Sequence, residues 1–164
     1  MLVSERIITC DWTSDGGFLE YDLSYLHPDL GTLIQSYEVY TTDTQGRRIY
    51  ASDFLLFPRN SAEEKDFGNY PKALKAQLWE IIFLVKRRFF EEIKPDVVTH
   101  FIDATHSIER RFALYSRWLF LPDYVITKTR QQIIYTRATP PDFGGGFLLW
   151  ATVYFLFNAQ PVAG

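Results

Sequence analysis

Residues 71–93, PKALKAQLWEIIFLVKRRFFEEI, decide the fold class of this 164-residue chain. Apolar side chains recur three and four positions apart, which is the spacing of one buried helical face. They are Leu74, Leu78, Ile81, Ile82, Val85, Phe89 and Ile93. The polar residues, Lys86 and Arg87 among them, fall largely off that face. Pro71 suits the first helical position and residues 94–96, Lys-Pro-Asp, stop the helix, so the stretch predicts one long amphipathic helix.

The residues before this helix alternate between apolar and polar side chains, and short turns rich in Gly and Asp separate the alternating runs. This period of two, with many β-branched and aromatic residues, is typical of strands joined as an antiparallel meander. The four predicted strands are residues 6–12, 18–26, 33–42 and 48–57.

The residues after the helix predict a strand, a second helix and further strands. The apolar run 97–102 is a candidate buried strand. Ser107 is a suitable N-cap for a shorter amphipathic helix that ends near Pro122. Residues 124–136 are typical of a strand, bent or folded into a hairpin around 128–131, and the apolar run 147–157 is either a closing strand or an exposed interaction segment.

The element order defines the expected fold class. Strands gathered early and a strand between two helices later are typical of an α+β domain. We therefore expect residues 1–164 to form a single α+β domain, in which a curved antiparallel sheet packs against two helices in the order β-β-β-β-α-β-α-β.

Charge and composition exclude several classes of protein. The net charge of −3 provides no overall positive field for a nucleic acid. One cysteine excludes a disulfide framework. The first residues lack the pattern of a secretory signal, and the run 147–157 is shorter than the roughly 20 residues that cross a membrane. We therefore expect a cytoplasmic protein that has no membrane partner.

From Pro71 onward the chain resembles the second half of the GNAT acetyltransferase fold. The residues that carry the resemblance are DVVTHFID at 96–103, which looks like the late strand of that family, and RRFALYSRWL at 110–119, which looks like its tyrosine-bearing helix. The resemblance implies acetyl-coenzyme A as cofactor and Tyr115 as the general acid toward the leaving thiolate. It also implies that Arg110 and Arg111 lie near the cofactor.

The stretch that corresponds to the family's pyrophosphate loop is degenerate. The family uses a Gly-rich loop at the start of its main helix, whereas residues 64–71 here read EKDFGNYP, with one glycine and several acids. Carboxylates near a helix N-terminus repel a pyrophosphate, and Pro71 removes one N–H donor. The loop therefore leaves two alternatives, a GNAT-like shell that no longer binds coenzyme A and a working transferase, and the first hypothesis includes no cofactor.

That first hypothesis is an interaction protein with an aromatic surface. The 14 Phe, 10 Tyr and 4 Trp are more large rings than a core of this size is expected to hide, and Tyr and Trp are enriched at interfaces. The partner would be another protein or a second copy, as in phage-encoded accessory proteins that block or redirect a host factor. The candidate partner-binding residues are Tyr37, Tyr40, Tyr50, Trp150, Tyr154 and Phe155.

Two further kinds of site were weighed. Arg87, Arg88 and Arg117 would carry a nucleic-acid or nucleotide site, with Arg110 and Arg111 beside them. Cations near a helix C-terminus are favourable on dipole grounds alone, so a nucleic-acid partner is not expected. His100, Asp103 and His106 have the side chains of a metal site. Their spacing on a strand sends the first two to opposite faces, so we expect no metal.

Overall fold

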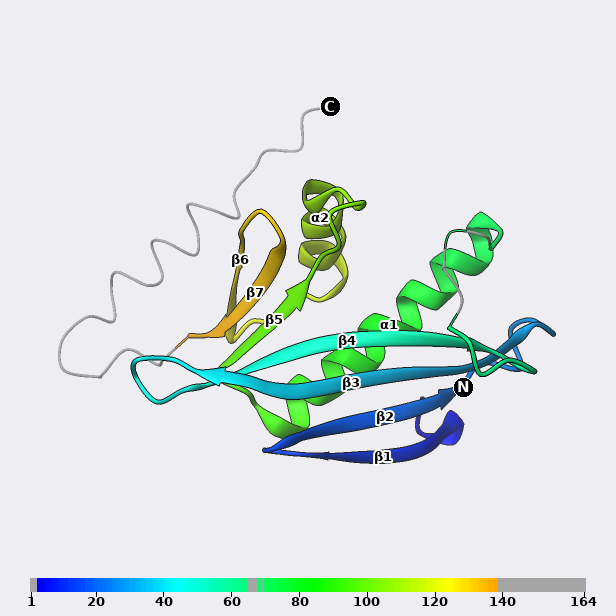
Figure 1. The fold of residues 1–164 in the computed structure, drawn as a ribbon, viewed down its shortest axis with the longest axis horizontal. Helices are drawn as coiled ribbons and strands as arrows, with labels where there is room; N and C mark the ends of the chain where they lie inside the picture. The colour runs from blue at the N-terminus through cyan, green and yellow to red at the C-terminus, as the bar shows by residue number, and fades with distance from the viewer. Residues whose placement is uncertain (1–2, 65–67, 69, 139–164) are drawn as a thin grey trace.

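The computed structural model describes residues 3–64, 68 and 70–138. The first half of the chain forms a four-stranded antiparallel meander (Figure 1). A 3-10 turn, η1 (Val3–Arg6), precedes it. The strands are β1 (Ile7–Thr13), β2 (Gly16–Asp22), β3 (Leu30–Thr42) and β4 (Arg48–Pro58). The alternation holds in β3, where Leu33, Gln35 and Tyr37 are fully buried and the residues between them are half-buried. The predicted meander is confirmed.

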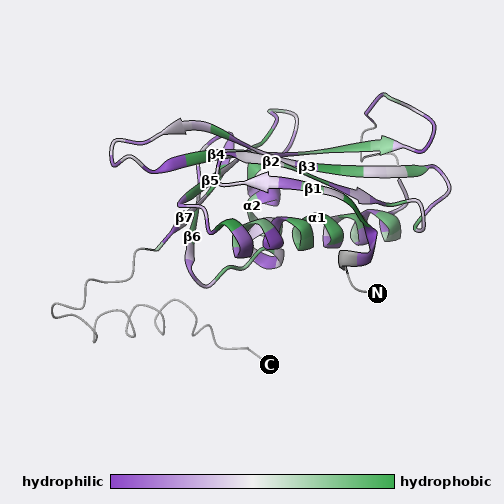
Figure 2. Cartoon of the chain, turned by 90° about the horizontal axis from the view of Figure 1, so that it is seen from below, coloured by the Kyte–Doolittle hydropathy of each residue, from purple (hydrophilic) through white to green (hydrophobic). Residues whose placement is uncertain are grey.

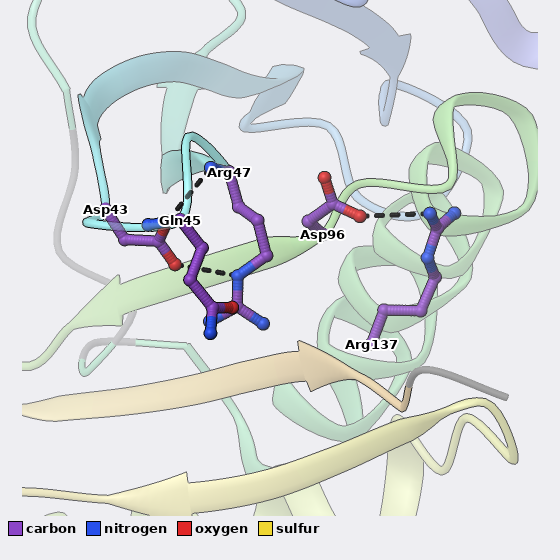
Figure 3. Close-up of polar contacts among 5 residues, drawn as sticks. All are labelled: Asp43, Gln45, Arg47, Asp96 and Arg137. Atoms are coloured by element: carbon purple, nitrogen blue, oxygen red, sulfur yellow. Dashed lines mark hydrogen bonds and ion pairs between the residues drawn. The ribbon is translucent and has the colours of Figure 1, made fainter. Parts of the chain in front are cut away.

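The turns of the meander depend on particular residues. At the start of β2, Gly17 has φ +136°, and a Cβ there would lie 1.9 Å from the carbonyl oxygen of Asp11, so only glycine fits. Between β3 and β4, the Asp43 carboxylate accepts hydrogen bonds from the backbone N–H groups of Gln45 and Arg47, both at 2.9 Å (Figure 3). It also accepts one from Arg47 Nε at 2.7 Å, which fixes the register of the two longest strands.

The long helix α1 (Lys72–Ile93) begins one residue later than the sequence predicts, with Pro71 as its N-cap. Its buried residues are Leu74, Leu78, Ile81, Ile82, Phe83, Val85, Lys86, Phe89 and Phe90. The predicted apolar face is therefore confirmed, except that Ile93 is half-buried. The expectation that Lys86 lies off that face is wrong, because Lys86 is 0% exposed.

The second half consists of β5 (Val97–Phe101), α2 (Ile108–Trp118), β6 (Tyr124–Lys128) and β7 (Gln132–Arg137). Ser107 is the N-cap of α2, as expected, and its hydroxyl accepts a hydrogen bond from the backbone N–H of Arg110. Residues 124–136 form a hairpin of two antiparallel strands, which decides between the two alternatives. The hydroxyl of Tyr135 donates to the carbonyl oxygens of Tyr115 and Leu119, at 3.2 and 3.1 Å, and so anchors the end of α2 to the sheet.

All seven strands form one sheet in the order β1-β2-β3-β4-β5-β7-β6. Both helices lie on one face of it (Figure 2), and the rings of Phe83 in α1 and Tyr115 in α2 meet edge to face at 5.0 Å. An ion pair of 2.9 Å between Arg137 and Asp96 ties the end of β7 to the start of β5 (Figure 3). The expected α+β class and its element order are confirmed.

Aromatic rings fill the core between the meander and α1. Phe89 is fully buried and its ring stacks on Tyr37, with centroids 3.5 Å apart. Trp12 and Tyr50 contact Phe89 edge to face, at 5.4 and 5.7 Å. Much of the aromatic surplus therefore belongs to the interior. In the part of the chain that the structure describes, no helix is long and apolar enough to cross a membrane.

Candidate functional site

A cleft of about 890 Å³ opens where β4 and β5 separate. The two strands pair in parallel from Ile49 with Val97 to Ser52 with His100. Beyond these pairs they diverge (Figure 1), because β4 continues along β3 while β5 continues along β7. The cleft is lined by residues 52–56 of β4, residues 100–106 after the pairing ends, Arg111 and Tyr115 of α2, Glu64 and Gln131.

A chain of buried polar side chains lies at the inner end of this cleft. Gln35 Nε2 donates to Ser52 Oγ at 3.0 Å and to the carbonyl oxygen of Asp53 at 2.5 Å. Lys86 Nζ lies 2.8 Å from Ser52 Oγ and 3.5 Å from His100 Nδ1. Strands β3, β4 and β5 and helix α1 each supply one of these side chains, so the chain assembles only when the helix docks on the sheet.

Lys86 is the most unusual member of this chain. Its amine is surrounded by the rings of Tyr37, Phe54 and Tyr115, at 5.8, 5.8 and 6.0 Å from their centroids. Within the described residues, no carboxylate lies at ion-pairing distance from Lys86 Nζ. Burial therefore lowers the pKa of Lys86 from 10.5 to about 7, against a smaller opposing effect of the Asp53 carboxylate. A large fraction of this amine is uncharged at neutral pH.

His100 and Tyr115 are both uncharged at neutral pH. Burial, with the neighbouring amine of Lys86, lowers the pKa of His100 well below its usual value. Within the described part of the chain, its Nε2 is buried and has no hydrogen-bond partner. The rings of His100 and Tyr115 lie 4.8 Å apart. Burial raises the pKa of Tyr115 above its usual value of 10.0, so the phenol keeps its proton.

The structure brings together two of the three residues that the GNAT resemblance implicates. Tyr115 and Arg111 both line the cleft, and the Arg111 guanidinium also lies over the ring of Trp79 at 4.6 Å. Arg110 is exposed on the first turn of α2 and is not part of the cleft wall. Of the two neighbouring arginines, Arg111 therefore lines the cleft and Arg110 does not.

The predicted aromatic surface is only partly exposed. Tyr37 and Tyr50 are 0% and 3% exposed, so their assignment as partner-binding residues is wrong: both rings pack around Phe89. Tyr40 is 64% exposed and contacts Phe101, which is 49% exposed, edge to face at 5.6 Å. The remaining three candidates lie outside the described residues, as does the apolar run 147–157. They are Trp150, Tyr154 and Phe155.

The other predicted arginines contact groups of the chain itself. Arg87 donates to the carbonyl oxygens of Phe120 and Trp118, at 3.1 and 3.2 Å, and thereby joins α1 to the end of α2. Arg88 forms an ion pair of 2.5 Å with Glu92. Arg117 lies over the ring of Trp118 at 5.8 Å. These contacts give all three side chains a role within the fold.

The three side chains of the candidate metal site all line the cleft but do not converge. His100 is buried at the inner end, whereas Asp103 and His106 are exposed at the mouth. The Asp103 carboxylate accepts a hydrogen bond from the backbone N–H of Thr105 at 2.7 Å. Within residues 3–64, 68 and 70–138, no three His, Cys, Asp or Glu side chains are placed to hold a metal ion.

Comparison with known proteins adds no assignment to this geometry. No protein-family model and no curated protein sequence matches this chain. The functional argument therefore depends on the cleft and on the polar chain behind it.

Proposed function

We propose that this chain is a divergent, GNAT-like acyltransferase that binds an acyl thioester in the cleft between β4 and β5. The observation that carries the proposal is the position of Tyr115 in the wall of the cleft, beside the point where the two strands separate. The resemblance assigns to this residue the proton donor for the leaving thiolate. The phenol is protonated at neutral pH and can donate a proton, although burial raises its pKa and so makes it a weaker acid.

The shape of the cleft suits an extended ligand that carries amide groups. Two strands that diverge present main-chain edges to the space between them, and such edges pair with extended chains that supply their own N–H and C=O groups. The pantetheine arm of an acyl carrier is such a chain. Its thioester end would lie near Tyr115, whose side chain is buried.

The charge of the cleft wall favours the arm over the nucleotide of coenzyme A. Asp53, Glu64 and Asp103 line the cleft, and Arg111 is the one Lys or Arg side chain among its described lining residues. A ligand with several phosphates meets more repulsion than attraction there. We therefore expect acetyl-pantetheine, which lacks these phosphates, to bind at least as tightly as acetyl-coenzyme A.

Isothermal titration calorimetry with both donors tests the proposal. We expect saturable binding of acetyl-pantetheine, with acetyl-coenzyme A equal or weaker. Raised salt should narrow the difference between the donors, because salt screens the repulsion. Absence of binding of either donor at millimolar concentration would overturn the proposal.

Replacing Tyr115 by phenylalanine is expected to slow thioester cleavage while donor binding stays close to that of the wild type. Loss of a positioned general acid costs about a hundredfold in rate. Release of free thiol from acetyl-pantetheine measures the rate, and calorimetry measures the binding. Tyr25→Phe, in the exposed loop between β2 and β3, is the matched control and should leave the rate unchanged. An unchanged rate in Tyr115→Phe would remove the tyrosine from the mechanism.

A second candidate function, that of an interaction protein, is supported by the exposed Tyr40 and Phe101 pair. Exposed rings in contact are typical of the centre of a protein interface. The partner would be a second copy of the chain or another cytoplasmic protein. Sedimentation of the wild type and of a Tyr40→Ser, Phe101→Ser double variant tests self-association, and a wild type that is monomeric at high concentration would exclude the second copy.

A further inference from the structure

The hydrogen atom of the Ser52 hydroxyl has two candidate acceptors, the uncharged amine of Lys86 and the phenol oxygen of Tyr37. Among the described residues, Ser52 Oγ has hydrogen bonds with Gln35 Nε2 and Lys86 Nζ, and the phenol of Tyr37 also lies within its reach. A glutamine NH₂ group only donates, so it occupies a lone pair of Oγ. A charged ammonium would also only donate, whereas an uncharged amine has a lone pair and accepts the hydroxyl hydrogen. The uncharged state of Lys86 therefore offers the Ser52 O–H a base.

The surroundings of Lys86 favour that uncharged state. Its side chain is 0% exposed and aromatic rings surround the amine. The groups that face Lys86 are Asp53 from β4, His100 from β5, Tyr37 from β3 and Tyr115 from α2. The Asp53 carboxylate favours the charged amine, and the ring faces of Tyr37 and Tyr115 also attract a cation. Burial outweighs these effects and lowers the pKa.

The order of the groups relative to the cleft is that of a nucleophile and its base. Ser52 lines the cleft, and Lys86 lies behind Ser52, outside the wall. His100 also lines the cleft, and its Nδ1 lies 3.5 Å from Lys86 Nζ. When the lone pair of the uncharged amine accepts the Ser52 hydrogen, the amine donates to this Nδ1, which places the imidazole proton on Nε2. That Nε2 has no partner in the described part of the chain, although it is buried. An unpaired buried donor beside the nucleophile is suited to bind the oxygen of a reacting carbonyl.

We infer that Ser52 and Lys86 are a nucleophile and base pair that takes the acyl group from the bound thioester, so that transfer proceeds through an acyl-serine. This inference rests on the proposed function. Ser52 Oγ attacks the carbonyl carbon while its proton passes to Lys86 Nζ. The C–O bond forms, the C–S bond breaks, and the electron pair leaves on sulfur. The thiolate takes a proton from Tyr115 or from the Lys86 ammonium, and attack by water or an acceptor on the ester frees the serine.

Intact-protein mass spectrometry after incubation with acetyl-pantetheine, or with p-nitrophenyl acetate as an activated ester, tests the inference. We expect the mass to increase by one acetyl group and peptide mapping to place that group on Ser52. Ser52→Ala should remove the label while calorimetric binding of acetyl-pantetheine remains. Ser52→Cys keeps a nucleophile at this position and should therefore restore the acetyl label. An acetyl group on any other residue would overturn the assignment.

The rate of acylation and its dependence on pH test the role of Lys86. In Lys86→Met we expect acylation by p-nitrophenyl acetate to slow about a hundredfold, as on the loss of a general base. In the wild type the rate should rise with pH near the pKa of Lys86, about 7, and this rise should vanish in Lys86→Met. The Tyr115→Phe variant should keep the rise, since it keeps the base. A wild-type rate that is flat with pH would overturn the role of Lys86.

The failure of this inference and the failure of the proposed function give different results. Binding of acetyl-pantetheine and thiol release without any labelled residue would mean direct transfer, which overturns the acyl-serine and leaves the acyltransferase. Absence of binding, of thiol release and of any label on Ser52 would overturn both. Labelling by p-nitrophenyl acetate on Ser52 without binding of either thioester would support the pair and move its substrate to another class of ester.

Discussion

Lys86→Met is expected to raise the free energy of unfolding by about 3 kcal/mol at pH 7. The pKa of this amine falls from 10.5 in the unfolded chain to about 7 in the folded one, and each unit corresponds to about 1.4 kcal/mol. Release of the Lys86 proton on folding therefore costs about 4 kcal/mol at pH 7. Methionine fills a similar volume without a charge. Loss of the contacts with Ser52 and His100 lowers the gain in stability by about 1 kcal/mol. Urea unfolding at pH 7 measures the difference.

The pH dependence of the free energy of unfolding tests separately whether Lys86 destabilises the fold. Between pH 7 and 10.5 the unfolded chain holds a proton on Lys86 that the folded chain has released, so stability increases as the pH rises through this window. Above pH 10.5 Lys86 is uncharged in both the folded and the unfolded chain. Below pH 7 it is charged in both, and the cost of burying this charge no longer changes with pH. In Lys86→Met this contribution should be absent. Lys72→Met, exposed on the first turn of the same helix, should leave both stability and its pH dependence close to those of the wild type.

Phe89→Ala is expected to lower the free energy of unfolding by about 4 kcal/mol, the usual cost of removing a fully buried aromatic ring. The ring is 0% exposed and contacts Tyr37, Trp12 and Tyr50, so the cavity opens at the centre of the interface between α1 and the meander. Leu84→Ala, on the same helix at a side chain that is 39% exposed, should cost far less. Equal losses in the two variants would show that Phe89 is not at the centre of the core.

The fold was largely predictable because its elements have strong local patterns. The alternation of 33–42 predicted that Leu33, Gln35 and Tyr37 share one face of β3, but not that this face is the buried one. Turn residues and Ser107 marked the ends of strands and the start of α2. The pairing of β4 with β5 was not predictable from such patterns, because it joins residues that are far apart in the chain.

Several residues of the cleft, Tyr115, Arg111 and His100 among them, were predicted as candidate site residues, whereas Gln35, Ser52 and Lys86 were not. Lys86 follows Ile82 by four residues and precedes Phe89 by three, so its place on the buried face of the helix was already in the sequence. Gln35 gave a weaker signal, since it shares one face of its strand with Leu33 and Tyr37. The contact of both residues with Ser52 depends on how α1 packs on the sheet, which no local pattern encodes. The excess of aromatic rings predicted an exposed surface, whereas Tyr37 and Tyr50 pack against Phe89 in the core.

The short parallel ladder between β4 and β5 also bears on how the chain folds. Strands β1 to β4 are neighbours in sequence and form by closing short hairpins, as do β6 and β7. The ladder from Ile49 to Ser52 must instead wait until α1 and the connector before it have brought Val97 back to β4. Closing so long a loop for a few hydrogen bonds is entropically unfavourable until the helix has docked. We therefore expect the step that joins the two parts of the sheet, and that brings Ser52, Lys86 and His100 together, to come late in folding.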